Sequence, residues 1–190
     1  MRKWKRVETA DGPRFRSALD ANEAALLKNL VGSMIELLDE RESSSPPDEL
    51  EQITGMKTGN SEPPDNATLQ RLLPDFSKPV GDTVDATDQL NAALRSLYEP
   101  EIIEAKRLAA QQLLATVPDD GGKFELTEDA ANAWVAAVND IRLALGTMLD
   151  IRPGGPDRLP DEHPMASHLD VYQWLTFLQE YLVLALVGSR

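Results

Sequence analysis

The sequence predicts a mainly α fold, a helical bundle of five or six helices with a small N-terminal antiparallel β-hairpin. Two observations predict it. Apolar residues recur at three- and four-residue spacing over several long segments, which is typical of helices with one buried face. Strand-like segments are confined to the first 19 residues and a short stretch around Phe124. We expect the Phe124 stretch to join the hairpin as a third strand, since two strands alone are marginally stable.

The 190 residues suit one domain, 1–190, with enough chain to bury a sizeable core. Within it we expect a β-hairpin over 1–19. Residues 43–88, which hold several prolines, read as a loop-rich insertion with short helices. The main helical core is then formed by 89–190 together with 20–42.

The hairpin is predicted from the opening stretch MRKWKRVETADGPRFRSAL, which contains the turn signal Asp-Gly-Pro. A consistent register pairs Trp4 with Leu19, Arg6 with Ser17 and Glu8 with Phe15 on one face. Because strand side chains alternate, the basic residues of the other face then form a cationic surface. That surface consists of Lys3, Lys5, Arg14 and Arg16.

The helices follow in order. Asp20 and Glu23 predict a capping box at the start of a helix that ends near Arg41. Two short helices are expected at Asp48 to Thr54 and at Ala67 to Leu73.

A longer helix is expected from about Ala86, and we expect Pro100 to break or restart it. It then continues to about Val117. The residues that its spacing places inward are Leu90, Ala93, Leu94, Leu97, Ala105, Leu108, Ala109, Gln112 and Leu113.

The C-terminal third predicts two more helices. Thr127 caps one that runs to about Asp150, and the last fills roughly 169–187. The first of these carries an apolar stripe of Trp134, Val138, Ile141, Leu145 and Met148. We expect this stripe to form the deep core.

A polar group is expected on the shoulder of that stripe. Arg142 is costly to bury unless it is paired, so we expect an acid or a carbonyl on another helix to satisfy it. Glu180 in the last helix is the first candidate. The buried polar tie would consist of Asn139, Asp140, Arg142 and Glu180. A structural role and a ligand pocket both fit this pattern.

The charge distribution is uneven. The chain has 32 acidic and 19 basic residues, a net charge of −13, yet six of its first 16 residues are Lys or Arg. The acidic bulk argues against nucleic acid or anionic lipid binding over the whole surface. The basic hairpin is either a solvated strand face or a contact for phosphates or an acidic partner. The candidate contact residues are Lys3, Lys5, Arg6, Arg14 and Arg16.

The sequence lacks the residues that several classes of chemistry require. The sequence has no cysteine, which excludes disulfides, zinc–thiolate sites and thiol switches. It has no phosphate-binding loop, nucleophile elbow or metalloprotease motif. His163 and His168 read as solvated or helix-capping residues, and Glu99, Glu101 and Glu104 as charges at a helix start. We therefore expect no catalytic residue, metal or cofactor, and no enzyme activity.

Four segments together resemble one known family: MRKWKRVETADGPRFRSAL, LYEPEIIEAKRLAAQQLL, WVAAVNDIRLALG and VYQWLTFLQEYLVLALVGS. It is an actinobacterial family of domains of unknown function encoded near the protease adaptor ClpS, and it includes a redox-responsive transcription regulator. The resemblance implies a cytoplasmic, non-enzymatic transcription regulator that contacts a sigma factor or another RNA polymerase protein. Contact with DNA through the hairpin is secondary.

The same resemblance leaves a second class open, an adaptor or accessory protein of Clp proteolysis. Whether the protein forms a homodimer also stays open. Because no run of 18 apolar residues occurs, we expect no membrane contact. A thiol sensor needs cysteine, so any redox input to this chain has to come through a partner.

Overall fold

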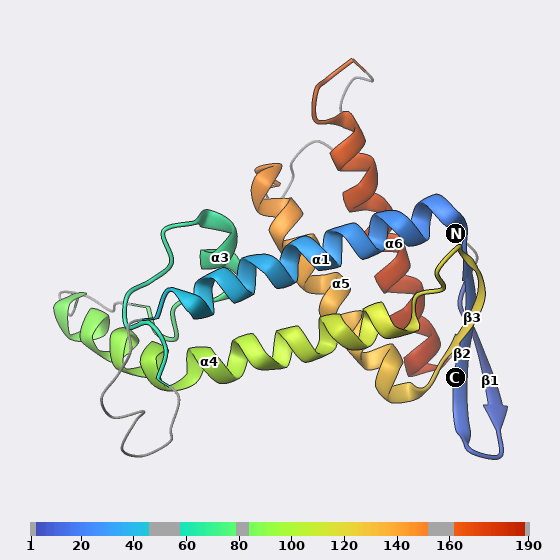
Figure 1. Ribbon diagram of the computed structural model, residues 1–190, viewed down its shortest axis with the longest axis horizontal. Helices are drawn as coiled ribbons and strands as arrows, with labels where there is room; N and C mark the ends of the chain where they lie inside the picture. Colours follow the sequence, from blue (N-terminus) through green and yellow to red (C-terminus); the bar gives the residue numbers. More distant parts are fainter. Residues whose placement is uncertain (1–2, 46–57, 79–83, 152–161, 189–190) are drawn as a thin grey trace.

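The computed structural model describes residues 3–45, 58–78, 84–151 and 162–188. This part of the chain contains five helices and one three-stranded antiparallel sheet, which confirms the mainly α fold with a third strand beside the hairpin (Figure 1). The elements are β1 (Lys5–Thr9), β2 (Gly12–Leu19), α1 (Ala21–Ser43), α3 (Ala67–Leu72), α4 (Val84–Thr116), β3 (Gly122–Leu126), α5 (Glu128–Met148) and α6 (Ala166–Val187). The helix expected at Asp48 to Thr54 lies outside the described residues.

The helices form a bundle that the sheet closes at one end (Figure 1). Helix α5 packs against both α4 and α6, and α1 packs along α4. Strand β1 and the last turns of α6 meet beside the sheet (Figure 1). This meeting point positions the candidate site.

The sheet has β2 in its centre, with β1 and β3 as edges. The predicted register of the hairpin is wrong by two residues, because Arg6 lies opposite Phe15 and not Ser17. The predicted core face is nevertheless right, since a shift of two residues returns every side chain to the same side. Trp4, Phe15, Ser17 and Leu19 are all buried on it.

The two predicted N-terminal caps, at Asp20 and Thr127, are confirmed. The N–H of Glu23 donates to Asp20 Oδ1 at 2.8 Å, and the N–H of Asp20 donates to Glu23 Oε2 at 2.9 Å, which is the capping box. Thr127 accepts from the N–H of Ala130 at the start of α5. The indole of Trp174 also donates to Glu23 Oε1 at 3.2 Å, which ties α6 to the first turn of α1.

Helix α4 is continuous through Pro100, so the predicted break is wrong. A proline has no N–H, and the carbonyl four residues before it loses its helical donor. Here that carbonyl belongs to Ser96, and the N–H of Gly59 donates to it at 2.7 Å. A donor from outside the helix replaces the one that Pro100 lacks.

The first half of α4 buries the face opposite to the predicted one. Thr87, Asn91, Arg95 and Glu99 are buried, whereas Leu97 is 59% exposed. Leu90, Ala93, Ala105, Leu108 and Gln112 are exposed as well, and of the predicted inward residues only Leu113 is fully buried. Polar partners on the preceding segment, 58–78, cover the polar face, and this decides the orientation.

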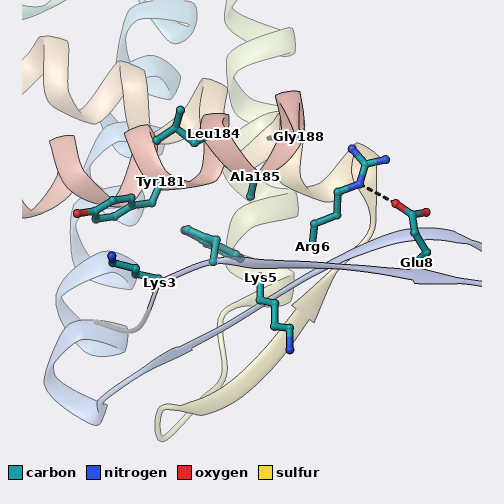
Figure 2. Close-up of a pocket in the computed structure, with 9 residues that line it drawn as sticks. Lys3, Lys5, Arg6, Glu8, Tyr181, Leu184, Ala185 and Gly188 are labelled. Carbon is teal, nitrogen blue, oxygen red and sulfur yellow. Dashed lines mark hydrogen bonds and ion pairs between the residues drawn. The ribbon is translucent and has the colours of Figure 1, made fainter. Parts of the chain in front are cut away.

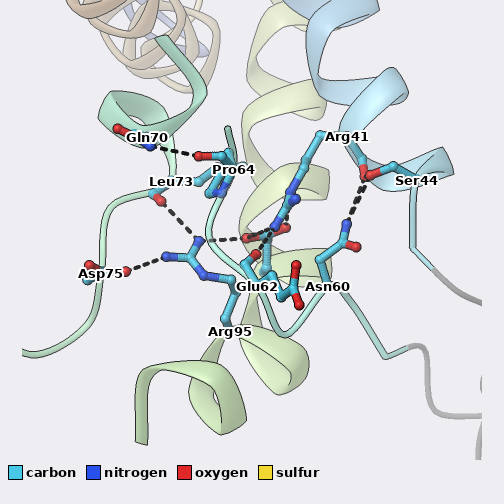
Figure 3. A network of polar contacts seen from close by, with 10 residues as sticks. Arg41, Ser44, Asn60, Glu62, Pro64, Gln70, Leu73, Asp75 and Arg95 are labelled. Carbon is cyan, nitrogen blue, oxygen red and sulfur yellow. Dashed lines mark hydrogen bonds and ion pairs between the residues drawn. The ribbon is translucent and has the colours of Figure 1, made fainter. Parts of the chain in front are cut away.

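A buried charge network fixes that orientation (Figure 3). Glu99 accepts from Arg41 at 2.7 Å and from Arg95 at 2.8 Å, and all three side chains are almost fully buried. Arg95 also donates to Asp75 at 2.6 Å and to the carbonyl of Leu73 at 3.1 Å. Glu99 is therefore no charge at a helix start. It is the shared anion of two guanidinium groups.

The stripe on α5 is buried at Trp134, Val138, Ile141 and Leu145, as expected. Met148 is 61% exposed, so its assignment to the deep core is wrong. The helix ends at Met148, and this residue lines an open hollow between α1, α3 and α5 instead of the closed core.

We expect Gly59→Ala to lower the free energy of unfolding by about 1–3 kcal/mol. A Cβ at this position would lie 2.8 Å from Pro100 Cδ, so the loop has to move away from α4 and the N–H bond to Ser96 is weakened. Gly32→Ala is the matched control, because a Cβ inside α1 there meets nothing within 4 Å. It should stabilise by about 0.5–1 kcal/mol, since alanine is the better helix former. Urea unfolding of both variants measures the difference, and equal effects would contradict this account.

Candidate functional site

The candidate site is a hollow of about 660 Å³ between the N-terminal strand and the C-terminal turns of α6 (Figure 2). We call it the β1–α6 groove. Its lining residues are Lys3, Trp4, Lys5, Arg6, Glu8, Tyr181, Leu184, Ala185 and Gly188. Three of these are cations and one is an acid, on a chain whose net charge is −13.

The floor of the groove is apolar and well anchored. The Trp4 indole N–H donates to the carbonyl of Leu178 at 3.2 Å, which satisfies its one polar atom. Its ring meets Trp134 edge-on at 5.6 Å and Phe124 edge-on at 5.4 Å. The start of the chain is thus held to α5, α6 and β3 by one side chain.

The cations stand around this floor. The Lys3 ammonium lies 5.7 Å from the centre of the Tyr181 ring, within the range of a cation–π contact. Arg6 donates to the carbonyl of Leu186 at 3.3 Å and pairs with Glu8 at 2.8 Å. Figure 2 shows Lys3 reaching toward Tyr181, whereas Lys5 points to the other side of the strand.

The predicted single cationic face is therefore divided. Lys3 precedes β1 and turns toward α6, and it does not share a face with Lys5 as expected. Arg16 on β2 pairs at 2.5 Å with Glu125 on the neighbouring strand β3, and Arg14 lies 3.6 Å from the same carboxylate. Arg14 and Arg16 are thus partly neutralised on the far face of the sheet. The groove keeps Lys3 and Arg6, and Lys5 stands at its edge.

Arg142 is tied to α6, but not through Glu180. Its Nε donates to Thr176 at 3.0 Å and its terminal nitrogen donates to Gln179 Oε1, and its guanidinium lies 5.4 Å from the Tyr172 ring. The side-chain amide nitrogen of Gln179 in turn donates to the carbonyl of Val135 at 3.1 Å. Glu180, the first candidate, is exposed on α6, and the side-chain carbonyl of Gln179 on the same helix is the partner instead, which agrees with the expected acid or carbonyl on another helix.

The other two residues of the predicted tie separate from Arg142. Asn139 is half-buried on α5. Asp140 is buried and faces α4, where Lys106 donates to it at 2.7 Å. Burial raises the pKa of Asp140 above its ordinary value, and the Lys106 ammonium partly offsets that rise. These contacts join α5 to α6 and to α4, which is a structural role.

A second hollow, about 370 Å³, lies between α1, α3 and α5. It is mostly apolar, with Met34, Leu37, Ile141 and Met148 among its walls. Sequence reasoning missed this hollow because it assigned Ile141, Leu145 and Met148 of α5 to the deep core.

His163 lies in the turn before α6, where its Nδ1 accepts from the N–H of Met165 at 3.1 Å. In the part of the chain that the structure describes, no three His, Asp or Glu residues gather in a way that could hold a metal ion. None of the described helices is long and apolar enough to cross a membrane.

Known proteins resemble the chain over nearly its full length. A family model described as "Domain of unknown function (DUF2017)" matches residues 1–186. Proteins named "Oxidative stress regulator AosR" from Mycobacterium tuberculosis (strain ATCC 25618 / H37Rv) and Mycobacterium bovis are each 67% identical over 196 residues. The alignment covers 100% of this chain and 90% of each relative. No solved structure matches the chain.

Proposed function

Because the chain belongs to the DUF2017 family, we propose that it is a cytoplasmic regulator of transcription that acts by protein–protein contact. Its partner is a sigma factor or another protein of the RNA polymerase, and the β1–α6 groove is the contact surface. The protein carries out no catalysis in this role. Relatives that share two thirds of its residues are named oxidative stress regulators, which supports a regulatory role for this chain.

One observation carries the choice of surface. An acidic chain places Lys3, Lys5 and Arg6 around the apolar floor of a single groove. Complementary charge steers a partner and suppresses wrong ones, and buried apolar contact supplies the affinity. An acidic partner surface with one apolar side chain at its centre fits both properties.

The division of the basic residues supports protein over DNA as the main partner. Phosphate binding gains from each cation that it engages. Arg14 and Arg16 already share Glu125 on the far face, and Arg6 pairs with Glu8 in the groove, so a duplex there meets fewer unpaired cations than the sequence predicts. Contact with DNA therefore stays secondary in this proposal.

The test is capture of partners from a native lysate. We expect the wild-type protein to retain a sigma factor, and the double variant Lys3→Glu, Arg6→Glu to lose most of it. Lys123→Glu is the matched control, because it changes the charge of an exposed lysine on the opposite edge strand of the same sheet.

Capture of Clp components in place of transcription proteins would overturn the proposal in favour of the adaptor. Equal capture by the groove variant and the control would remove the groove as the surface. Binding of promoter DNA that falls steeply with salt and is lost in the same variant would make DNA the main partner.

A further inference from the structure

We propose that the β1–α6 groove binds its partner as an extended acidic segment, which adds to the free edge of β1 as a fourth strand. The inference rests on the proposed function, because it names the form in which a partner occupies the same groove. Four observations carry it: the open edge of β1, the position of α6, the placement of the cations and the spacing along the groove.

The first observation is that β1 has an unpaired edge. It is an outer strand of the sheet and pairs with β2 alone. Facing residues in an antiparallel pair alternate between those that exchange hydrogen bonds and those that do not. Pro13 lies opposite Glu8 and has no N–H to exchange, which assigns Glu8 and Arg6 to the second kind. Their backbone N–H and C=O groups then point away from β2.

Those outward groups have no backbone partner among the residues that the structure describes. An edge strand with free N–H and C=O groups is a template for another strand. The five residues of β1 present about 17 Å of edge. A segment of similar length fits along it.

The second observation is that a helix walls the groove on its far side. The last turns of α6 line the hollow with Tyr181, Leu184 and Ala185, facing the strand (Figure 2). A groove between an edge strand and a helix is the arrangement in which extended peptides add to a sheet. Main-chain hydrogen bonds then give affinity, and the side chains that face the helix give specificity.

The third observation is the charge at the edge. Two copies of β1 placed side by side would bring Lys5 and Arg6 of each copy together, so repulsion disfavours a second copy of this chain. Glu8 pairs with Arg6 and offsets one of the three positive charges, so the groove keeps a net positive charge that favours an acidic strand. The cations therefore select a partner of negative charge, and they also keep the edge of β1 from pairing with a second copy of this chain.

The fourth observation is the spacing. Lys3 and Arg6 lie on either side of Ala185 along the groove, and Glu8 lies beyond Arg6 (Figure 2). Because alternate residues of a strand share a face, the fitting segment has an apolar residue flanked two positions away on each side by an acid. The pattern is acid, any residue, apolar, any residue, acid.

The experiment uses the full chain and the capped peptide Thr-Glu-Thr-Val-Thr-Glu-Thr, which has this pattern. We expect binding that shifts the Tyr181 ring resonances and slows amide exchange at Arg6 and Glu8, but not at Val7, whose N–H already faces β2. Lys3→Glu should weaken binding about tenfold, since it turns attraction into repulsion. Lys123→Glu should leave it unchanged.

Two control peptides test the mode of binding. The permuted peptide Thr-Thr-Glu-Glu-Val-Thr-Thr has the same composition without the alternation, and an N-methylated form of the first peptide cannot form the ladder. We expect neither to bind. Equal binding by either peptide, exchange that slows at Val7 only, or no binding by the first peptide would overturn strand addition.

These outcomes separate the inference from the proposed function. If a sigma factor is captured through Lys3 and Arg6 while the patterned peptide fails, strand addition is wrong and the regulator proposal stands. If the peptide binds as described and no transcription protein is captured, the groove binds strands but serves another partner.

Discussion

Glu99→Gln should lower the free energy of unfolding by about 3–5 kcal/mol. The substitution removes the one carboxylate that Arg41 and Arg95 share, and both guanidinium groups lie almost fully buried beside it. A buried charge that loses its partner keeps its desolvation cost without the compensating attraction. Asp75 stays with Arg95, but its side chain is 56% exposed, so solvent screens that pair.

Urea unfolding measures the loss. Glu101→Gln is the matched control, because Glu101 is an exposed glutamate two positions along the same helix, and its substitution should change stability by less than about 0.5 kcal/mol. A second variant separates charge from packing. Arg41→Met, Arg95→Met and Glu99→Leu together should recover much of the stability, since apolar residues of similar volume often replace a buried ion network without loss. Equal stability of Glu99→Gln and Glu101→Gln would contradict the burial argument.

The sequence could not predict this network, and the reason is physical. Arg95 and Glu99 stand four residues apart, a spacing that is most often an exposed pair on a helix. Leu90 and Leu97 on the other face make the opposite orientation look better by apolar periodicity. The choice depends on Arg41, Asp75 and the carbonyl of Leu73, which come from distant parts of the chain. The apolar periodicity of one segment contains no information about partners that come from distant segments.

The hairpin shows which part of a strand pair is predictable. The alternation of side chains placed Trp4 and Phe15 on the buried face correctly, because that face depends only on whether a residue number is odd or even. The register depends on which residues form the turn. In the structure these are Ala10 and Asp11, and β2 begins at Gly12. An error of two residues in the register therefore made every predicted cross-strand pair wrong but left every side chain on its correct face.

The candidate site was predictable in its residues but not in its shape. The basic stretch and Trp4 identify the right segment of the chain. The groove itself needs α6, whose Tyr181 and Leu184 lie far away in sequence. Side-chain alternation assigns Lys3 to the Lys5 face, yet Lys3 precedes the strand and turns to the Tyr181 ring instead. A residue just outside a regular element does not follow the period of that element.

Trp134→Ala should lower the free energy of unfolding by about 3–5 kcal/mol. The side chain is fully buried, meets Trp4 edge-on and stacks on Phe124 with ring centres 5.2 Å apart. Truncation removes this packing and leaves a cavity that the neighbouring strand and helices fill only partly. It also deprives Thr116 of the indole donor at 2.7 Å.

Two controls show whether burial is the cause. Leu97→Ala also truncates a large apolar side chain, but on the exposed face of α4, and should change stability by less than about 0.5 kcal/mol. Thr116→Val removes the acceptor of the indole N–H, together with the hydroxyl that donates to the carbonyls of Gln112 and Leu113 within α4, and should cost about 1–3 kcal/mol. Equal losses for Trp134→Ala and Leu97→Ala would contradict the packing described for the core.

The same variant connects the core to the groove. Trp134 does not line the groove, yet Trp4 rests on it and forms the floor between Lys3 and Arg6. Loss of the Trp134 ring frees Trp4 to move, and binding then costs the entropy of ordering it again. We therefore expect Trp134→Ala to weaken capture of the partner under conditions in which the variant is still folded, whereas Thr116→Val leaves capture unchanged. Capture that is unaffected in both variants would mean that the floor does not need its support.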